Sequence, residues 1–367
     1  MLLRAPSSTL ALLLLFAGFA AEISAAENVI FITWDGFRWQ EFFSGAEKAL
    51  ISKELGGVPE VKETRDAFWA ETPEARREKL LPFVWGKIAK EGQIFGDPAK
   101  KAAAKITNGL KFSYPGYNEM LTGYPNPAII SNAKVANPNV NVLEHLHRQK
   151  EFAGKVAAFA TWDVIEYVLN RERSGMVVHT GWIPLRDEPF TPGQKQVNEM
   201  VRDLPRLWRG NCFDVVTYTA AKEHLLKHKP RVLYIGMGET DEWAHAKRYD
   251  LYLEAAQRSD RQLQELWEIL QTEPQYKGKT TVILTTDHGR GDGAQWTNHG
   301  PTTAGAEFVW MAAFGADVPA LGVRSEVAVT QSQIAATLAA AVGVDYCKAY
   351  PRAAAPLPLQ EKAGNGN

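Results

Sequence analysis

The sequence predicts an α/β fold with an open, mainly parallel sheet and helices on both faces. Two observations lead to this prediction. Short, continuously apolar runs recur along the chain, and such runs are typical of strands that are buried on both faces. Segments with helical spacing lie between these runs, and strands that alternate with helices build a sheet covered on both sides. Ligands of such sheets bind beyond the carboxyl ends of the strands.

The expected strands share an aliphatic, β-branched composition, and they lie at 28–34, 155–161, 231–237, 281–286 and 307–314. The expected helices lie at 77–92, 142–150, 214–228, 249–271 and 330–343. In the segment at 249–271, apolar residues fall on one face and charged residues on the other. This pattern indicates a helix that packs against the sheet.

The N-terminus has the pattern of a secretory signal peptide. Arg4 precedes an apolar run at 10–21, and small residues follow at 24–26. The run is short for a permanent membrane span, which needs about 20 apolar residues. We expect cleavage after Ala26, although Ala20 also fits, and an exported, periplasmic or secreted protein without a permanent span. An uncleaved N-terminal anchor is the alternative.

The remaining chain shows no internal repeat, which predicts one domain at 27–350 and a flexible Ala/Pro-rich tail at 351–367. The formal net charge is −1, and no basic run stands out. Stable nucleic-acid binding is therefore not expected. The only cysteines, Cys212 and Cys347, form either one bridge or two separate thiols. The sequence leaves the oligomeric state open.

An aspartate follows each of three expected strands at or near its carboxyl end: Asp35, Asp241 and Asp287. One such residue is by default a turn former or a helix cap. Three at the functional edge of one sheet indicate a shared site instead. His245 and His288 lie close to the second and third aspartates in sequence.

His299 follows in a glycine-containing loop, and with His245 and His288 it is a candidate metal ligand. Carboxylate and imidazole ligands suit zinc, manganese or similar divalent ions. Two such ions about 4 Å apart stabilise both apical oxygens of a displacement at phosphorus. The other histidines are expected to be hydrogen-bonded structural residues: His145, His147, His179, His224 and His228.

Ser113 offers a hydroxyl close to this expected site. It precedes a Pro/Gly turn and the helix-like stretch at 118–123. A serine at a helix start is by default a cap, but a helix N-terminus is also an anion site.

In this order, Asp35, Ser113, Asp241-x-x-x-His245, Asp287-His288 and His299 resemble the alkaline phosphatase superfamily, most of all its nucleotide pyrophosphatase/phosphodiesterase-like branch. The resemblance covers nearly all of the mature chain. It implies an alkaline phosphatase-like fold with two divalent ions, zinc or alternatively manganese. Asp35, Ser113, Asp287 and His288 would form one metal site, and Asp241, His245 and His299 the other.

The resemblance also implies a phosphate-binding asparagine, which would be Asn132, with Asn118 and Asn137 as rivals. The family nucleophile is commonly Thr, and Ser113 preserves its hydroxyl chemistry. The related sulfatases require Cys-x-Pro-x-Arg or Ser-x-Pro-x-Arg, which does not surround Ser113. Export argues against the activity of the related phosphoglycerate mutases.

The expected activity is hydrolysis of a small-molecule phosphate ester, a monoester or a diester. Ser113 would attack phosphorus, and water would hydrolyse the phosphoseryl intermediate. The alternatives are phosphoryl transfer or mutase activity on the same fold, and a non-catalytic metal-binding homologue. Lys111 and Arg290 would add charge for a dianion, although each is by default a solvated cation. The aromatic residues near the proposed ligands either pack beneath loops or form a leaving-group pocket: Trp34, Phe37, Trp39, Tyr114, Tyr117, Trp243 and Trp296.

Overall fold

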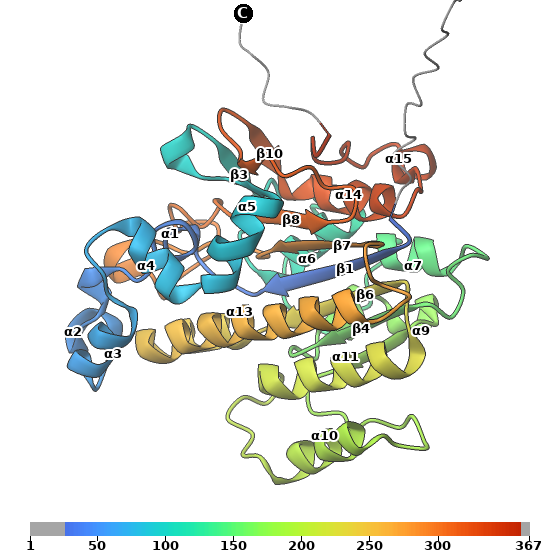
Figure 1. Cartoon of the computed structure of the whole chain (residues 1–367), viewed down its shortest axis with the longest axis horizontal. Coiled ribbons are helices and arrows are strands. Elements are labelled where there is room, and N and C mark those ends of the chain that lie inside the picture. Colours follow the sequence, from blue (N-terminus) through green and yellow to red (C-terminus); the bar gives the residue numbers. More distant parts are fainter. Residues whose placement is uncertain (1–25, 361–367) are drawn as a thin grey trace, which may run out of the picture.

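A computed structural model describes residues 26–360 (Figure 1). Apart from Ala26, the predicted signal peptide lies outside the described residues. The main sheet has eight strands in the order β5-β4-β6-β1-β7-β8-β2-β9. Their bounds are β1 Asn28–Trp34, β2 Gln93–Phe95, β4 Val156–Ala160, β5 Val177–Thr180, β6 Val232–Met237, β7 Thr280–Thr285, β8 Met311–Gly315 and β9 Gly322–Val323. A second, two-stranded sheet pairs β3 (Ala103–Lys105) with β10 (Ala328–Thr330).

The strands from β5 to β7 pair in parallel, as predicted, and β8 is antiparallel to both of its neighbours. The expected strand at 307–314 begins only at Met311. The segment before it pairs with the chain around β3 instead, since Val309 N–H donates to the Ala104 carbonyl. Strand β2 and the two edge strands, β5 and β9, are too short to give a periodic signal.

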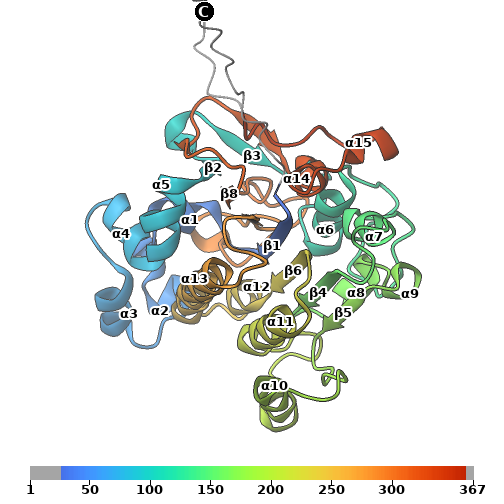
Figure 2. The same ribbon diagram turned by 45° about the vertical axis from the view of Figure 1, so that its right-hand side comes forward.

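Helices cover both faces of the sheet (Figures 1 and 2). One face carries α1 Trp39–Ser44, α2 Lys53–Gly56, α3 Val61–Phe68, α4 Pro73–Leu80, α5 Ala89–Glu91, α11 Asp214–His228, α12 Glu239–His245 and α13 Tyr249–Thr272, with α10 Pro192–Asp203 packed on α11. The other face carries α6 Ser113–Thr122, α7 Val142–His147, α8 Ile165–Val168, α9 Arg171–Ser174, α14 Ile334–Ala341 and α15 Tyr346–Ala349. Each layer of helices buries its own apolar cluster against the sheet.

The predicted helices at 214–228 and 249–271 correspond to α11 and α13. The segment at 77–92 is divided, because Pro82 has no N–H and disfavours helical backbone in the residue before it. Helix α4 therefore ends at Leu80, and a π-helical turn at Val84–Ile88 leads into α5.

The C-terminal segment at 351–360, which is the described part of the tail predicted at 351–367, packs on the domain. Ala354 N–H donates to the Gly123 carbonyl at 2.9 Å. Leu357 is buried, and its N–H donates to Thr337 Oγ1 at 2.8 Å. Residues 361–367 lie outside the described part.

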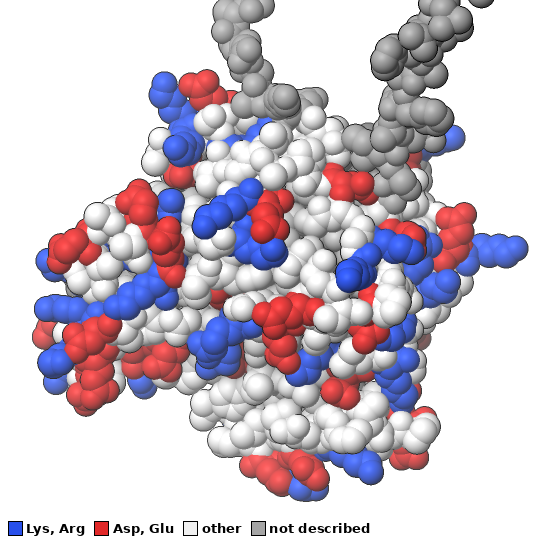
Figure 3. All heavy atoms as spheres, viewed as in Figure 1, with Lys and Arg blue, Asp and Glu red and all other residues white. Residues whose placement is uncertain are grey.

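Cys212 and Cys347 are both free, so two separate thiols are present. Among the described residues, no helix is long and apolar enough to span a membrane. On the face shown in Figure 3, positive and negative side chains are interspersed.

Candidate metal centre

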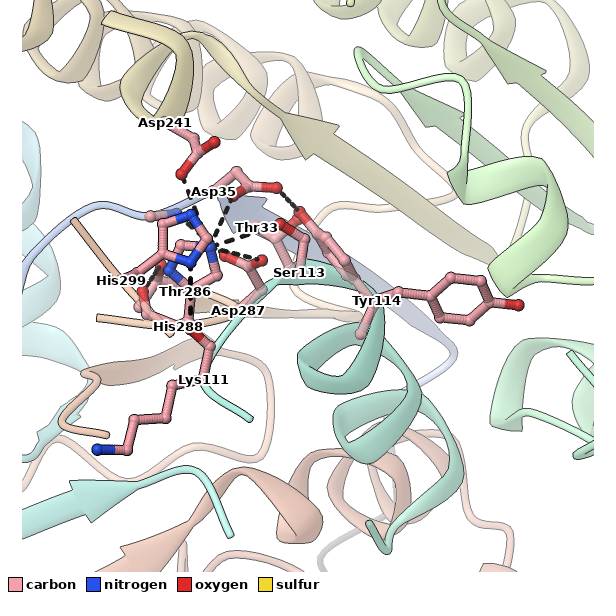
Figure 4. Close-up of polar contacts among 12 residues, drawn as sticks. Thr33, Asp35, Lys111, Ser113, Tyr114, Asp241, Thr286, Asp287, His288 and His299 are labelled. Carbon is pink, nitrogen blue, oxygen red and sulfur yellow. Dashed lines mark hydrogen bonds and ion pairs between the residues drawn. The ribbon is translucent and has the colours of Figure 1, made fainter. Parts of the chain in front are cut away.

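The three predicted aspartates meet at the carboxyl edge of the three central strands. Asp35 directly follows β1, Asp287 follows β7, and Asp241 lies on α12, the short helix after β6. Because β1 lies between β6 and β7 in the sheet, the three carboxyl groups converge (Figure 4).

Two glycines allow this close approach. Gly36 has φ +59°, and a Cβ there would lie 2.5 Å from Asp241 Oδ1. Its N–H donates to Asp287 Oδ1 at 3.0 Å. In α6, a Cβ on Gly116 would lie 2.4 Å from the Asp287 carbonyl oxygen. Only glycine therefore lets the first turn of α6 pack directly against the strand end that carries Asp287.

His288 lies at the middle of the cluster, fully buried. Its Nδ1 is 2.9 Å from the Gly289 carbonyl, so Nδ1 carries the proton and Nε2 keeps a free lone pair. Nε2 lies 3.5 Å from Asp35 Oδ1, 3.5 Å from Asp287 Oδ2 and 3.6 Å from Asp241 Oδ1. Four atoms that can each bind a cation thus point toward one another.

His245 and His299 extend the cluster toward solvent. Their Nε2 atoms are 3.1 Å apart, and His245 Nε2 is 3.1 Å from Asp241 Oδ2. His299 Nδ1 donates to the Lys111 carbonyl at 3.2 Å, so its Nε2, which faces His245, carries the lone pair. The His299 ring also stacks on His288.

The donor set fits divalent cations. Two groups can each surround an ion: Asp35, Asp287 and His288, and Asp241, His288 and His299. Asp35 Oδ1 and Asp287 Oδ2 are buried and have no hydrogen-bond partner among the described residues. Buried carboxylate oxygens without a partner are costly, and a bound cation removes that cost.

The pKa shifts report the same crowding of charge. Burial and the Asp241 charge raise the pKa of Asp287 to about 6. Burial and the Asp287 charge raise the pKa of Asp35 well above its usual range. Burial lowers the pKa of His288 to about 4, so its imidazole is neutral at pH 7.

Arg290 is fully buried rather than solvated, which corrects its default interpretation. Its guanidinium pairs with Asp241 Oδ1 and donates to the carbonyls of Gly36 and Thr297. Burial opposes the charge of Asp241, but Arg290 and His245 hold the pKa of this carboxyl well below its usual range. Arg290 therefore joins the loops that follow three strands and is not free to bind a substrate.

Ser113 is the first residue of α6, and its hydroxyl faces the cluster (Figure 4). The N-cap position belongs to Phe112, whose side chain makes no capping hydrogen bond. Ser113 Oγ lies 3.5 Å from His288 Nε2. One turn later, Tyr117 donates to Asp35 Oδ2 at 2.9 Å. The serine is thus not the cap that its position in the sequence suggests.

A cavity of about 180 Å³ opens beside Ser113 and contains Asn132. Asn132 Oδ1 accepts from Tyr114 N–H at 2.9 Å, and its Nδ2 bonds to no described residue. Its rivals are placed elsewhere. Asn118 and Asn137 are buried and bond to each other beneath the loop that contains Asn132. Of the three, only Asn132 lines this cavity.

Lys111 points away from the cavity, since its Nζ donates to Glu307 at 3.0 Å (Figure 4). None of the seven aromatic residues singled out in the sequence lines the cavity within the described chain. Trp34 and Trp296, for example, are buried in the core, which is the packing interpretation.

Sequence reasoning missed four residues that line the cavity, Gly238 and three with larger side chains: Trp162, Asn211 and Glu242. Asn211 Nδ2 donates to Glu242 Oε1, and Asn211 Oδ1 is buried without a hydrogen-bond partner in the described part of the chain. Glu242 directly follows Asp241, so adjacency to a predicted ligand was an available signal. Trp162 follows the expected strand at 155–161 and offered the same kind of signal. Asn211 had none, because it lies in a loop between two helices.

Comparisons with known proteins concern the family and the fold of the chain. A family model described as the metalloenzyme superfamily matches residues 212–346. This range includes Asp241, His245, Asp287, His288 and His299, but not Asp35 or Ser113. No curated protein matches the sequence.

Solved structures share the fold over most of the chain. The alkaline phosphatase PafA is 10% identical with a TM-score of 0.59, covering 88% of this chain and 97% of its own. The lipoteichoic acid synthase LtaP from Listeria monocytogenes is 12% identical with a TM-score of 0.53, covering 88% and 73%. A protein of the alkaline phosphatase superfamily from Vibrio parahaemolyticus is 14% identical with a TM-score of 0.52, covering 88% and 67%.

At these identities the likeness shows the fold, which is alkaline phosphatase-like as predicted. Together with the family-model match, it supports the alkaline phosphatase superfamily. The phosphodiesterase-like branch stays a prediction.

Proposed function

We propose that this chain is a metal-dependent hydrolase of phosphate esters with Ser113 as its nucleophile. The observation that carries the proposal is the position of Ser113 Oγ. It lies at the N-terminus of α6, 3.5 Å from His288 Nε2 in the middle of the Asp/His cluster. A helix N-terminus favours an anion, and the cluster fits divalent cations.

The residues of the cluster have two roles in the proposed reaction, as metal ligands and as the nucleophile. Asp35, Asp287 and His288 would hold one divalent ion, with Ser113 beside it, and Asp241, His245 and His299 the other. Bound ions would supply Lewis-acid stabilisation of the attacking and leaving oxygens. Ser113 Oγ forms the bond to phosphorus as the leaving-group oxygen departs. Water then cleaves the bond between phosphorus and Oγ and restores the serine.

Asn132 is suited to position the phosphoryl group. Its Oδ1 is held by Tyr114 N–H, the residue after Ser113, so the amide is fixed relative to the nucleophile. Its Nδ2 donor remains for a non-bridging oxygen, where charge develops during the displacement.

The charges around the cavity favour a phosphate diester. No Lys or Arg is among the described residues that line the cavity, whereas the acidic residue Glu242 does line it. Burial, together with the nearby charge of Asp241, raises the pKa of Glu242, although the hydrogen bond from Asn211 opposes the shift. A monoester carries about one more negative charge than a diester at neutral pH, and the lining residues offer no cation for it.

The test is a panel of an aryl phosphodiester, an aryl phosphate monoester, a nucleotide pyrophosphate and an aryl sulfate with zinc-loaded protein. The expected result is turnover of the phosphate esters, with kcat/KM highest for the diester. Turnover of the sulfate alone would refute phosphate-ester hydrolysis. Added acceptor alcohol would separate transfer from hydrolysis through the products.

Glu242→Gln sharpens the panel, because Gln keeps the oxygen that accepts from Asn211. Removing the negative charge should raise monoester kcat/KM severalfold relative to the diester. Glu166→Gln, which does not line the cavity, is the matched control and should leave that ratio unchanged. An unchanged ratio in Glu242→Gln would contradict the charge argument.

Export belongs to the same proposal. Strand β1 begins at Asn28, and Glu27 N–H donates to the Lys279 carbonyl. Cleavage after Ala26 would therefore leave the sheet intact. Mass spectrometry of the exported protein should find Glu27 as the first residue, and a retained Met1 would refute cleavage.

A further inference from the structure

A second cluster of metal-binding side chains lies outside the catalytic centre, at Asp187, His224 and His228. We propose that it binds one divalent transition-metal ion, with zinc as the expected ion. The ion would clamp the loop at 181–191 to α11.

The geometry brings the ligand atoms together from two elements. One ligand atom of each residue lies within 4.8 Å of those of the other two. His224 and His228 are one turn apart on α11, so they share a face of the helix, and their ring centroids are 4.6 Å apart. Asp187 comes from the loop before α10, and its Oδ2 lies 2.5 Å from His228 Nε2.

Ligand atoms remain available at this cluster. Neither ring nitrogen of His224 forms a hydrogen bond within residues 26–360. Asp187 Oδ2 accepts from His228 and Gln194, whereas Asp187 Oδ1 accepts from no described residue. A half-buried imidazole beside a carboxylate normally finds a partner. Two imidazoles and a carboxylate form a donor set that suits zinc.

The cluster lines a cavity of about 570 Å³, together with His179, Gln194 and Phe159. His179 is occupied, because its Nε2 lies 2.5 Å from the Ile183 carbonyl. With this volume, the cavity offers space for an ion and for water as a further ligand. Of the histidines expected to be structural, His224 and His228 are the two reinterpreted by this proposal.

Lys227 limits the affinity of the site. Its Nζ lies 3.0 Å from Asp187 Oδ2 and donates to the carbonyls of Asp187 and Pro189. This ammonium repels a second cation, so the site should bind zinc more weakly than the catalytic centre. Lys227 also gives a discriminating test. Loss of its ammonium should strengthen zinc binding if the cluster is a metal site, whereas it should weaken zinc binding if the cluster is only a set of ion pairs.

The proposed site is remote from the catalytic centre. Helix α11 starts at the catalytic edge, where Asp214 accepts from Gly238 N–H at 2.7 Å. His224 follows ten residues later, about 15 Å along the helix axis. The cavity is also lined by Gly154 and Arg171, which precede β4 and β5. It therefore lies at the amino edge of the sheet, and its test is independent of catalysis.

The experiment counts zinc ions per chain by equilibrium dialysis and metal analysis. The background is Asp241→Ala with His299→Ala, which weakens the catalytic centre. Adding His224→Gln and His228→Gln should lower the count by one ion per chain, or weaken zinc binding at least tenfold. The matched control, His145→Gln with His147→Gln on α7, should leave the number of zinc ions per chain and the zinc affinity unchanged.

Lys227→Gln in the same background should tighten zinc binding severalfold. Circular dichroism confirms that each variant is folded before its zinc content is measured. Equal counts with and without His224 and His228 would overturn the proposal, and so would weaker zinc binding in Lys227→Gln. Because the experiment measures zinc binding and not turnover, its result can be interpreted even if the proposed hydrolase function is wrong.

Discussion

His288 joins the two halves of the candidate metal centre. Its Nδ1 is fixed by the Gly289 carbonyl, and its Nε2 lies within 3.6 Å of one oxygen each from Asp35, Asp241 and Asp287. In the absence of a cation, the carboxyl groups repel one another. A proton and a metal ion therefore compete for the same oxygens.

Metal affinity should fall as the pH drops below about 6. In the metal-free protein, burial and Asp241 raise the pKa of Asp287 to about 6. Below that pH the carboxyl holds a proton that a cation must displace, whereas above it the carboxylate is free. His288, with a pKa of about 4, does not compete in this range. Zinc titrations by calorimetry at pH 7.5 and 5.5 check this, and equal affinities would contradict it.

Ser113→Ala should reduce turnover by about three orders of magnitude or more, because it removes the only proposed covalent nucleophile. Metal binding should be largely intact, since the carboxylate and imidazole ligands remain. Ser113→Thr is the matched control and should retain measurable activity through its hydroxyl. Acid quenching of the wild-type protein with labelled substrate should trap phosphate on Ser113. Label on a different residue would refute the assignment.

At this scale the sequence predicted which side chains meet but not what each one contacts. The order of acidic residues and histidines was sufficient to predict that Asp35, Asp241 and Asp287 lie at one edge of the sheet. The burial of Arg290 was not visible, because it depends on carbonyls from loops after different strands. Asn211 reaches the cavity only through the folded chain.

Helix α6 is held in place by a buried acid near its C-terminal end. Glu119 is fully buried and accepts from the backbone N–H groups of Thr107 and Asn108 and from Ser332 Oγ. These bonds tie the helix to the segment before it and to the chain before α14. The position of Ser113 therefore depends on contacts at the far end of its own helix.

Glu119→Ala should lower the free energy of unfolding by about 3 kcal/mol or more, because several buried donors lose a charged acceptor. Urea unfolding of the metal-free protein measures the change. Glu78→Ala, at an exposed position in α4, should change it by about 0.5 kcal/mol or less. Similar values for the two variants would show that Glu119 does not anchor α6.

Elements were predicted well where their apolar pattern was long or continuous. Strands β1, β4, β6 and β7 and helices α11 and α13 lie where their periodicity placed them. The short strands β2, β5 and β9 and the two-stranded sheet were missed, because two to four residues carry no period. Pro82 divided one expected helix, which its lack of an N–H explains.

For the whole molecule, metal binding at the sheet edge should stabilise the fold. Zinc at 100 times its dissociation constant should add about 2.7 kcal/mol to the free energy of unfolding for each ion that the centre binds. His224→Gln with His228→Gln provides the background, so that only the catalytic centre contributes. Chelator should remove the gain, and adding Asp241→Ala and His299→Ala should reduce it. Urea unfolding with and without zinc measures each case, and no gain in the background would contradict a preformed centre.

The C-terminal segment has a consequence for where the chain tolerates change. Gly123 ends α6 with φ +85°, a Cβ there would lie 2.6 Å from that of Ala353, and Ala354 N–H bonds to its carbonyl. Ala353 and Ala354 thus pack against the C-terminal end of the helix that carries Ser113. A stop codon before residue 353 would remove these contacts, so it should weaken the packing that positions Ser113 at the other end of the helix.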